Sequence, residues 1–427
     1  MKEKKHIIVV GGGFAGLEII KQLNKSDAYQ TTLVDMNNYN FFPPLLYQVA
    51  AGFMEPSAIS YPFRKILRSY KNVRFRMAYL ERIVPNENKI IVSNGEMSYD
   101  ILVLATGAET NFFGNENVAS YSMPMKSISD ALALRNSYLR RLERASRISD
   151  PEKRKKLLSY VIAGAGPTGV ELSGLFAEMR KNILQKDFPE LENEDLGDIY
   201  LIDGMESVLA PMSENAQKYT HEKLRELGVK IKLNTLVQDF RDDEVFLSDG
   251  STISSRNLIW AAGVISRVFD GLEKKDYGKG RRLVTSEFNR IIGYENIYAL
   301  GDTALVLGDP NFPEGHPQLA QPAIQQARNL GRNLVQSQKW KPFRYSDKGS
   351  MAIIGRNKAV ADIPNPKIFL KGFPAWFIWV FVHIMSLVNF KTKMRALYDW
   401  TGYYFRKDQS FRMIIQPSSH KTLPYNK

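Results

Sequence analysis

Three glycines near the start of this chain are spaced to hold a phosphate group. Gly11, Gly13 and Gly16 match G-x-G-x-x-G directly after the apolar run Ile7 to Val10, and a segment with helical spacing follows. The first glycine allows a tight turn, the second lets the backbone approach a pyrophosphate, and the third lets helix and strand pack closely. The free N–H groups and partial positive charge at the start of that helix attract anions. The pattern predicts a dinucleotide-binding loop.

An acidic residue supports this prediction. The apolar run Thr32 to Val34 ends in Asp35, near the interval of about 20 residues at which a ribose-binding carboxylate is expected. A lone G-x-G-x-x-G also fits a glycine-rich turn without a ligand. Strand, loop, helix and acid together favour the binding site.

The same pattern returns in the middle of the chain. The strand-like run Leu158 to Ala163 leads into Gly164, Gly166 and Gly169, and a second helical segment follows. The next apolar run ends in Asp203. Two dinucleotide-binding folds in one chain need two dinucleotides. A flavoprotein has this arrangement, because it holds its flavin permanently and binds and releases a nicotinamide dinucleotide in each turnover.

Asp203 bears on the choice of nicotinamide. A carboxylate at this place accepts hydrogen bonds from the ribose 2′-OH and repels a 2′-phosphate. The neighbouring residues 204–207 contain no arginine to bind a phosphate. The sequence therefore predicts NADH rather than NADPH.

Composition excludes several chemistries. The 427 residues include no cysteine, so disulfides, thiolate metal sites and thiol redox steps are absent. The five histidines are scattered without ligand spacing, and no metal site is expected. A net charge of +13 suggests a polyanionic partner, either nucleic acid or an anionic membrane. Only six residues precede the first strand, which leaves no room for a cleaved leader, so the chain is expected in the compartment where it is made.

Several strands end in small residues that could approach a cofactor. Ile101 to Ala105 ends in Thr106 and Gly107, and Asn257 to Val264 contains Gly263 in a similar turn. The aromatic stretch from Tyr39 to Gly52 either packs in the core or lines a flat cofactor.

Two further sites leave alternatives open. After the strand-like run from Asn296, Gly301 is followed by Asp302, which either caps a helix or accepts hydroxyls of a sugar alcohol chain. In the helical segment from Gln318, Gln321 and Gln325 are four residues apart and share one face. These amides are either solvated or bind carbonyls in an apolar pocket.

Two segments between these motifs are expected to be scaffold. Residues 127–146 have the pattern of a basic amphipathic helix, with Ser127 or Ser129 as its N-cap. The charged run Asp150 to Lys156 is interpreted as a solvated linker.

The tail after residue 372 has the composition of a membrane-surface segment. Phe373 to Phe390 is intensely apolar and aromatic, and its length is at the low edge for a span, which needs about 20 residues. His383, Ser386 and Asn389 form a narrow polar stripe. Basic residues mixed with tyrosine and tryptophan follow, at 391–407. A monotopic anchor over 373–412 is favoured, a dimer interface or a transmembrane span being the alternatives. Nucleic acid is not expected, since no recognition fold is visible.

Taken together, these motifs resemble the type II NADH dehydrogenases, single-subunit NADH:quinone oxidoreductases among the flavoproteins with two dinucleotide-binding domains. The matching segments cover nearly the whole chain: VVGGGFAGLE, VDMNNYNFFPPLLYQVAAG, LVLATGAETN, GAGPTGVELSGLFAEM, IWAAGV, YALGDTA, AQPAIQQA and KGSMAIIGRNKAVAD. The resemblance implies that the first glycine loop binds FAD and the second binds NADH.

The same resemblance implies roles for individual residues. Gly301 and Asp302 would contact the ribityl or pyrophosphate of FAD, and Gln321 and Gln325 would lie by the quinone and the isoalloxazine. Glu171 would lie near nicotinamide and flavin, and Lys348 near the flavin. Asp203 departs mildly from the family, in which glutamate is frequent.

The expected architecture is α/β, with two Rossmann-like domains and C-terminal amphipathic membrane-anchoring helices. Residues 1–115 and 266–340 are assigned to the FAD-binding domain, 116–265 to the NADH-binding domain and 341–427 to the membrane-anchoring region.

The expected reaction passes hydride from NADH to FAD and two electrons to ubiquinone or menaquinone. It occurs without proton pumping, since no helical bundle with buried ionisable relays is visible. The expected location is the cytoplasmic face of a bacterial cell membrane. The sequence does not decide whether the chain forms a homodimer.

Three other functions share parts of this pattern. Sulfide:quinone oxidoreductases use cysteines, which this chain lacks. A soluble NADH-dependent ferredoxin or rubredoxin reductase would leave the tail unexplained. A non-catalytic NAD(H)-binding membrane protein would not bleach a bound flavin when NADH is added.

Overall fold

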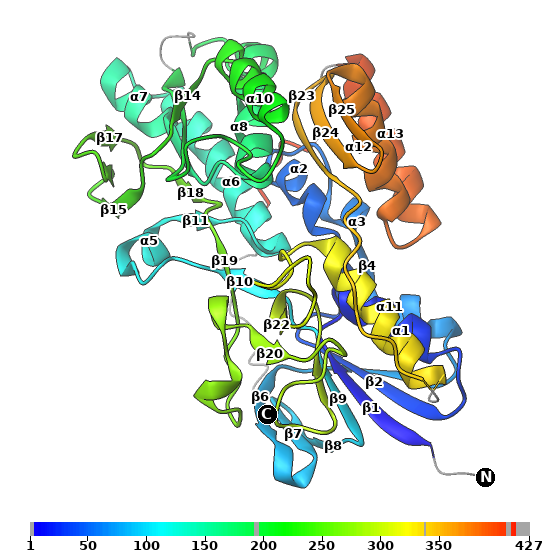
Figure 1. The fold of residues 1–427 in the computed structure, drawn as a ribbon. Helices are drawn as coiled ribbons and strands as arrows, with labels where there is room; N and C mark the ends of the chain where they lie inside the picture. Colours follow the sequence, from blue (N-terminus) through cyan, green and yellow to red (C-terminus); the bar gives the residue numbers. More distant parts are fainter. Residues whose placement is uncertain (1–3, 192–195, 337–338, 407–410, 416–427) are drawn as a thin grey trace. The chain divides into compact units, whose positions relative to one another are not determined.

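The computed structural model describes residues 4–191, 196–336, 339–406 and 411–415 (Figure 1). The chain forms two compact units, each built from three separate segments. Unit 1 consists of Met1–Phe41, Ser60–Asn111 and Gly263–Lys348. Unit 2 consists of Phe42–Ile59, Phe112–Ala262 and Gly349–Lys427. The four-part assignment to cofactors and membrane made from the sequence stays a prediction.

A five-stranded parallel sheet forms the centre of unit 1, in the order β21-β9-β1-β2-β5. These strands are β1 (Lys5–Val10), β2 (Tyr29–Asp35), β5 (Val73–Met77), β9 (Ile101–Leu104) and β21 (Ile297–Ala299). Ile7 and Val9 of β1 pack with α1 (Phe14–Leu23) and α11 (Ala320–Gln336). Ile8 and Val10 pack into a second core on the other face. Burial on both faces explains the unbroken β-branched run.

Smaller elements complete unit 1. Its remaining strands are β3 (Tyr39–Phe41), β4 (Ser60–Pro62), β6 (Leu80–Val84), β7 (Lys89–Val92), β8 (Gly95–Ser98), β10 (Ala108–Thr110), β19 (Val264–Ser266), β20 (Leu283–Thr285) and β22 (Ala304–Val306), and its further α-helix is α4 (Phe63–Ile66). The sheet β6-β7-β8 covers the second core through residues such as Ile83 and Ile90.

Unit 2 repeats the parallel-sheet plan in the order β11-β18-β12-β13-β14. Its strands are β11 (Met123–Pro124), β12 (Tyr160–Ala163), β13 (Ile199–Ile202), β14 (Val229–Lys232) and β18 (Leu258–Trp260), with the antiparallel sheet β15 (Val237–Arg241), β16 (Glu244–Leu247) and β17 (Thr252–Ser254). Its helices before residue 349 are α2 (Leu46–Ala50), α3 (Pro56–Ile59), α5 (Glu116–Tyr121), α6 (Ile128–Ala145), α7 (Pro151–Leu158), α8 (Pro167–Met179), α9 (Gln185–Asp187) and α10 (Glu214–Glu226). Two helix-covered parallel sheets confirm the predicted α/β class.

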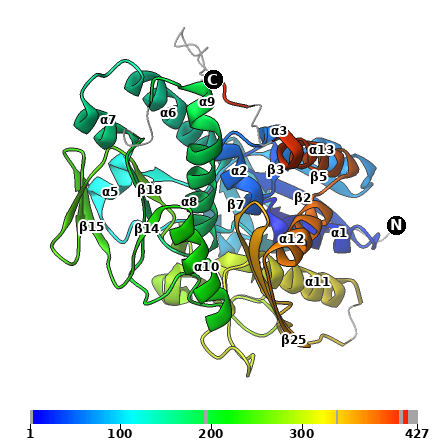
Figure 2. The ribbon, with the colours of Figure 1, turned by 90° about the horizontal axis from the view of Figure 1, so that it is seen from above.

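An antiparallel sheet packs on α8 and carries the C-terminal helices (Figure 2). It contains β23 (Ser350–Gly355), β24 (Lys358–Pro364) and β25 (Lys367–Lys371), and α12 (Phe373–Ser386) and α13 (Phe390–Arg406) follow. Gly174 allows the close approach, because a Cβ added there would lie 1.7 Å from the Ile354 carbonyl oxygen. Ser213, the N-cap of α10, donates its backbone N–H and its hydroxyl to Asp362 of β24, both at 2.8 Å.

Two scaffold predictions had different outcomes. The helix from Ser127 is confirmed, because the Ser127 hydroxyl accepts the Asp130 N–H and the Asp130 carboxylate accepts the Ser127 N–H. The linker prediction at Asp150 to Lys156 is wrong, since α7 occupies it. Asp150 caps that helix by accepting the N–H groups of Glu152 and Lys153, and a proline at the first helical position favours the start.

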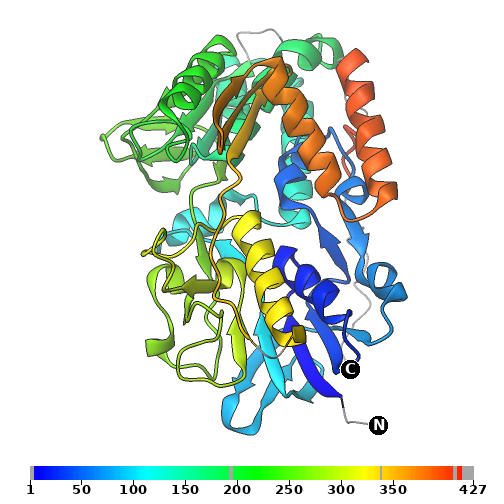
Figure 3. The same cartoon turned by 45° about the vertical axis from the view of Figure 1, so that its right-hand side comes forward.

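The C-terminal tail forms two helices, α12 and α13, in agreement with the expected C-terminal helices. α12 ends at Ser386, and Asn389 begins α13 by accepting the Thr392 N–H (orange and red in Figure 3). Within the described part of the chain, no helix is long and apolar enough to cross a membrane. Residues 407–410 of the predicted anchor lie outside the described residues.

Candidate active site

The first glycine loop is shaped by close backbone approaches. Gly11 has φ +100°, and a Cβ there would lie 2.3 Å from the Ala105 carbonyl oxygen. A Cβ at Gly16 would lie 1.8 Å from the Gly11 carbonyl oxygen. By contrast, no atom lies within 4 Å of the Cβ position of Gly13. The loop is therefore tight toward the protein and open on the side where a pyrophosphate would bind.

Asp35 at the end of β2 holds this loop. Its carboxylate accepts the Gly12 N–H at 2.7 Å and the Asn37 N–H at 2.8 Å. Burial raises the pKa of Asp35, and the hydrogen bonds from Asn37 and Gly12 oppose the rise in part. A carboxylate can accept more than these two hydrogen bonds, which is compatible with a ribose hydroxyl.

The turns after β9 and β21 come together in unit 1. The Thr303 hydroxyl lies 3.1 Å from that of Thr106 and 3.2 Å from the carbonyl oxygen of Gly107. The Gly301 N–H donates to the side chain of Gln326 at 2.7 Å. The turn that contains Thr106 and Gly107 and the turn that contains Gly301 are far apart in sequence, yet they lie together at one edge of the sheet. Gly107 leaves that edge open, with no atom within 4 Å of its Cβ position.

Asp302 does not cap the short helix that contains it. This 3₁₀ turn spans Gly301–Thr303, its N-cap position is Leu300, and no side chain makes a cap hydrogen bond. Capping is therefore the wrong alternative for Asp302. Its carbonyl oxygen accepts the Gln318 side-chain amide at 3.2 Å.

The second glycine loop repeats the geometry of the first. Gly164 has φ +103°, and a Cβ there would lie 2.7 Å from the Ala261 carbonyl oxygen. A Cβ at Gly169 would lie 1.8 Å from the Gly164 carbonyl oxygen, and no atom lies within 4 Å of the Cβ position of Gly166. Gly263, with φ +80°, begins the last segment of unit 1.

Asp203 at the end of β13 matches Asp35. Its carboxylate accepts the N–H of Ala165, which follows the first glycine of the loop, and that of Met205 at 2.8 Å. In both units the acid therefore binds the loop and presents remaining acceptor positions.

Glu171 lies on α8 and is buried in unit 2, with 8% of its surface exposed. Burial raises the pKa of Glu171 well above its usual value, and interactions with the Ile353 N–H and the Trp379 side chain oppose this rise only in part. The Ile353 N–H is 3.5 Å from the carboxyl oxygen. Burial therefore favours the protonated form of the carboxyl group, which can donate a proton.

Glu171 lines an aromatic cavity within unit 2. The volume open to the centre of a water molecule is about 40 Å³, enough for a few waters. Its lining residues are Tyr47, Gln48, Phe53, Glu171, Leu175, Glu178, Ile353, Ile354, Gly355, Arg356, Trp376, Trp379, Val380 and Trp400.

Two tryptophans of this cavity differ in their hydrogen bonding. The Trp400 N–H donates to Gln48 at 2.6 Å, and Gln48 donates to the Tyr47 hydroxyl at 2.9 Å. The Trp379 N–H is buried, and its interaction with the Glu171 carboxyl group partly opposes the rise in the pKa of Glu171. The cavity thus combines apolar walls with a buried carboxyl group and an indole N–H donor.

Gln321, Gln325 and Lys348 come together in unit 1. The Gln325 amide donates to the Ser346 carbonyl oxygen at 2.9 Å and accepts the Ser346 N–H at 3.0 Å. Gln321 accepts the Lys348 N–H at 3.1 Å. Both amides contact the backbone of one segment, which the sequence did not predict.

The sequence also missed most of the cavity. Gln48 lies in the aromatic stretch that it singled out, and Trp379 and Trp400 lie in the apolar tail. No spacing rule connects these segments, since they meet only through tertiary packing.

The two sheets and their glycine loops define a class of protein, the oxidoreductases with two dinucleotide-binding domains. The family model for pyridine nucleotide-disulphide oxidoreductases matches residues 5–327, and that for the NDH2 C-terminal domain matches residues 348–406. This chain is 35% identical to the type II NADH:quinone oxidoreductase Ndh of Mycobacterium tuberculosis, over 93% of its own length and 88% of the relative. It is 30% identical to NdhA of the same organism, over 93% and 86%.

The chain belongs to the type II NADH:quinone oxidoreductase family, as the sequence motifs predicted. It is an oxidoreductase that uses FAD and NADH. NDH2 of Plasmodium falciparum in complex with NADH has the same fold, with a TM-score of 0.87 at 23% identity over 97% of this chain and 100% of that one. The sulfide:quinone oxidoreductase of Aquifex aeolicus also shares the fold, with a TM-score of 0.72 at 18% identity over 95% and 96%.

Proposed function

We propose that this chain oxidises NADH and reduces a membrane quinone, with FAD bound in unit 1. The observation that carries the acceptor side is the cavity of unit 2, where Glu171, whose pKa burial raises, lies among aromatic walls beside α12. A quinone ring is flat and apolar, and its carbonyl oxygens accept hydrogen bonds and protons. In the cavity, Glu171 can donate a proton and the Trp379 N–H can donate a hydrogen bond to a quinone oxygen.

In this proposal the FAD contacts come from unit 1. The open face of the first loop and the acceptor positions of Asp35 fit a pyrophosphate and a ribose. The proposed FAD-binding residues are Gly11, Gly13, Gly16, Asp35, Thr106, Gly107, Gly301 and Asp302. Bound FAD would supply hydride acceptance from NADH and electron transfer to the quinone. The protein residues bind and orient the reactants.

The NADH contacts come mainly from unit 2. Gly164, Gly166 and Gly169 leave the open side of their loop for the pyrophosphate, and Asp203 receives the ribose. Gly263 would add a backbone contact.

At the acceptor end, residues of the chain supply hydrogen bonds and a proton. Glu171 gives its proton to a quinone oxygen, and the Trp379 N–H stabilises the negative charge that develops there. We also propose that Gln321, Gln325 and Lys348 of unit 1 take part in the acceptor half of the reaction.

We further propose that α12 and α13 attach the protein to one face of a membrane. Their outer face exposes Phe373, Phe377, Phe381, Met385, Val388, Phe390, Met394, Leu397 and Tyr398, each at least 43% accessible. An apolar helix beside basic residues such as Lys391 is typical of a membrane interface. Attachment at the cytoplasmic face of the cell membrane would bring a lipid-soluble quinone to the cavity.

The polar side chains of α12 are compatible with this attachment. The ring of His383 makes a hydrogen bond with the Trp379 carbonyl oxygen at 2.7 Å, and the Ser386 hydroxyl donates to that of Val382 at 2.7 Å. Burial lowers the pKa of His383 to about 4, so its ring is neutral at physiological pH. Internal hydrogen bonds reduce the cost of placing these groups near lipid.

The proposal is tested by following NADH oxidation with a short-chain quinone and with ferricyanide as a soluble acceptor. The purified protein should be yellow, bleach anaerobically with NADH, and reduce both acceptors. Glu171→Gln should lower quinone reduction far more than ferricyanide reduction, since ferricyanide takes up no proton. Equal losses would remove Glu171 from the quinone step, and a flavin that NADH does not bleach would favour a non-catalytic NAD(H)-binding protein.

A further inference from the structure

Unit 1 contains a fully buried acid–histidine pair that the proposed function does not use. The Nε2 atom of His316 lies 2.9 Å from a carboxylate oxygen of Asp309, and their side chains are only 2% and 0% exposed. Burying a carboxylate costs free energy unless hydrogen bonds compensate. The pair therefore needs a structural or functional explanation.

Aromatic rings enclose the imidazole of His316. Its ring centre lies 5.3 Å from that of Phe312, 5.0 Å from Phe343 and 5.7 Å from Tyr345. Its Nδ1 atom is buried without a hydrogen-bond partner. Assigned a proton on Nε2, the ring donates a hydrogen bond to the Asp309 carboxylate.

Asp309 joins two separate segments. The oxygen that faces His316 also accepts the Tyr345 N–H at 2.9 Å, and the other oxygen accepts the Asn311 N–H at 3.2 Å. Burial by itself would raise the pKa of Asp309, but hydrogen bonds from His316, Tyr345 and Asn311 outweigh it and lower the pKa. The ionised carboxylate thus ties the loop before α11 to the segment Phe343 to Lys348.

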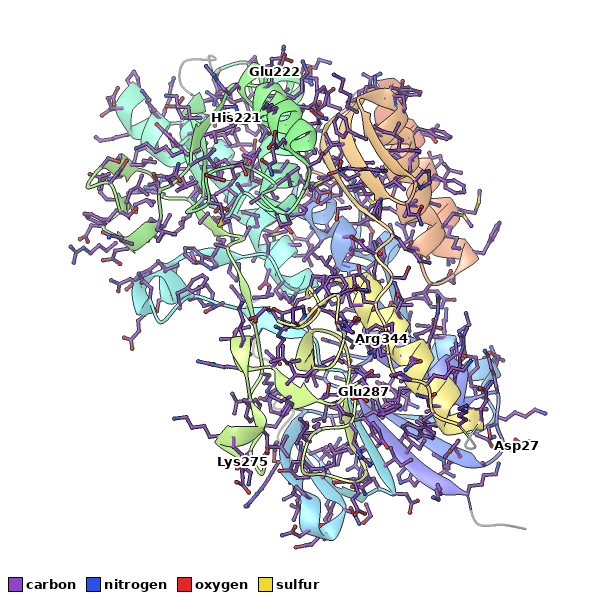
Figure 4. All side chains as sticks on the ribbon, viewed as in Figure 1. Asp27, His221, Glu222, Lys275, Glu287 and Arg344 are labelled. Carbon is purple, nitrogen blue, oxygen red and sulfur yellow. The ribbon has the colours of Figure 1, made fainter. Side chains whose placement is uncertain are left out.

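The backbone of this segment is held at further points. The Phe343 N–H donates to the Glu287 carbonyl oxygen at 2.6 Å, and Arg344 donates to the Gly308 carbonyl oxygen at 2.9 Å. Figure 4 labels Glu287, in the turn after β20, and Arg344, in the irregular segment before β23.

The amides of Gln325 and Gln321 bind the same segment at Ser346 and Lys348. Residues 343–348 therefore lie between the buried pair and α11.

We propose that Asp309 and His316 are a positioning pair for quinone reduction. They fix one side of residues 343–348 while Gln321 and Gln325 hold the other, and so set the position of Lys348 at the acceptor end. This inference rests on the proposed function, which puts these glutamines and Lys348 at that end.

The test compares three variants of the full-length, flavin-loaded protein. His316→Phe keeps an aromatic ring but loses the donor, Asp309→Asn loses the charge, and His316→Gln keeps an N–H donor. The readouts are kcat and KM for a short-chain quinone and for ferricyanide, with bound FAD measured by absorbance. Loss of a charged hydrogen bond predicts a rise of about tenfold in the quinone KM for His316→Phe and Asp309→Asn. KM for NADH, FAD content and ferricyanide reduction should stay unchanged, and His316→Gln should restore most of the quinone KM.

A buried residue of unit 2 supplies the matched control. Asn257 is fully buried and donates to the carbonyl oxygens of Leu157 and Ser159 at 2.8 and 2.7 Å. Asn257→Ala should lower the melting temperature as His316→Phe does, without changing the quinone KM. If His316→Phe lowers only the melting temperature, the positioning role is overturned and the pair is a stability element.

Hydrogen exchange separates this inference from the proposed function. The amides of residues 343–348 should exchange faster in His316→Phe than in the wild type or in Asn257→Ala. A wild type that reduces no quinone would reject the proposed function, while unchanged exchange at these amides would reject the positioning pair.

Discussion

At the scale of single residues, one contact recurs in both units. Asp35 accepts the N–H of Gly12, and Asp203 accepts the N–H of Ala165, each the residue after the first glycine of its loop. In the proposed function the acid has two tasks: it fixes the glycine loop, and it would offer an acceptor to the ribose. A substitution at either acid should disturb both contacts.

Asp203→Asn tests this double role on the nicotinamide. An asparagine side chain has only one acceptor oxygen, so it cannot serve both the Ala165 and Met205 N–H groups as the carboxylate does. The loss of a charged acceptor predicts a KM for NADH that is higher by about tenfold. Removal of the negative charge also weakens the repulsion of a 2′-phosphate. Initial rates with NADH and NADPH should show a smaller preference for NADH than in the wild type, and an unchanged ratio would contradict the role.

Glu171 links the proposed proton donation to stability. Because burial raises its pKa in the folded state, the folded protein holds this proton more tightly than the unfolded chain, whose glutamate pKa is about 4.3. Its stabilisation is complete below the unfolded pKa and is lost as pH rises toward the folded value.

Glu171→Gln should therefore gain thermal stability relative to the wild type as pH rises above the unfolded glutamate pKa of about 4.3. Melting temperatures across this range measure the difference. Glu222→Gln is the matched control, because the Glu222 side chain is 66% exposed on α10. A difference between wild type and Glu171→Gln that does not change with pH would show that Glu171 keeps an ordinary pKa.

At the scale of elements, α12 has two opposite faces. Trp379 and Ala375 are 1% and 0% exposed within unit 2, whereas Phe377 and Phe381 are each 57% exposed. The buried face lines the cavity, and the outer face is available to lipid. One helix would thus connect the membrane with the acceptor site.

Phe377→Glu and Phe381→Glu should weaken binding to phospholipid vesicles. Each change removes an aromatic side chain worth about 1.5–3 kcal/mol of apolar burial, so each should lower the affinity by about tenfold or more. Vesicle co-sedimentation measures the effect. Ile292→Glu is the control, because Ile292 is 56% exposed and lies outside α12 and α13. Unchanged sedimentation with a loss of dimers in gel filtration would identify this face as a dimer interface instead.

Local patterns were sufficient for much of the fold. The β-branched runs and glycines predicted β1, α1, β12 and α8, because each signal lies within one short segment. The Asp150 run was misread, because its charges concealed a proline and an N-cap that begin α7. The cavity and the Asp309–His316 pair could not be predicted, since their residues meet only through tertiary contacts.

The hydrogen bonds of Gln321 and Gln325 also could not be predicted from the sequence. Helical spacing puts Gln321 and Gln325 on one face, but it does not say that residues 346–348 run along that face. A spacing rule identifies which side chains share a surface, and the packing of the rest of the chain decides what covers it.

At the scale of the whole molecule, charge and apolar surface suggest one partner. The net charge of +13 attracts any polyanion, but the exposed aromatic face of α12 and α13 favours an anionic membrane over a nucleic acid. The two contributions differ physically, since salt screens the attraction by the net charge and leaves the burial of the aromatic face in lipid nearly unchanged.

Salt dependence therefore separates the two parts of membrane attachment. Binding to vesicles that contain anionic lipid should fall steeply between about 50 mM and about 500 mM NaCl, and it should level off at the affinity for neutral vesicles. A lysine near an anionic surface contributes about 1 kcal/mol, so Lys391→Gln should weaken low-salt binding about fivefold and leave high-salt binding unchanged. Lys275→Gln is the control, since that side chain is 75% exposed in unit 1 (Figure 4). Equal effects of the two substitutions would mean that the net charge, rather than the basic residues beside the apolar helices, attracts the membrane.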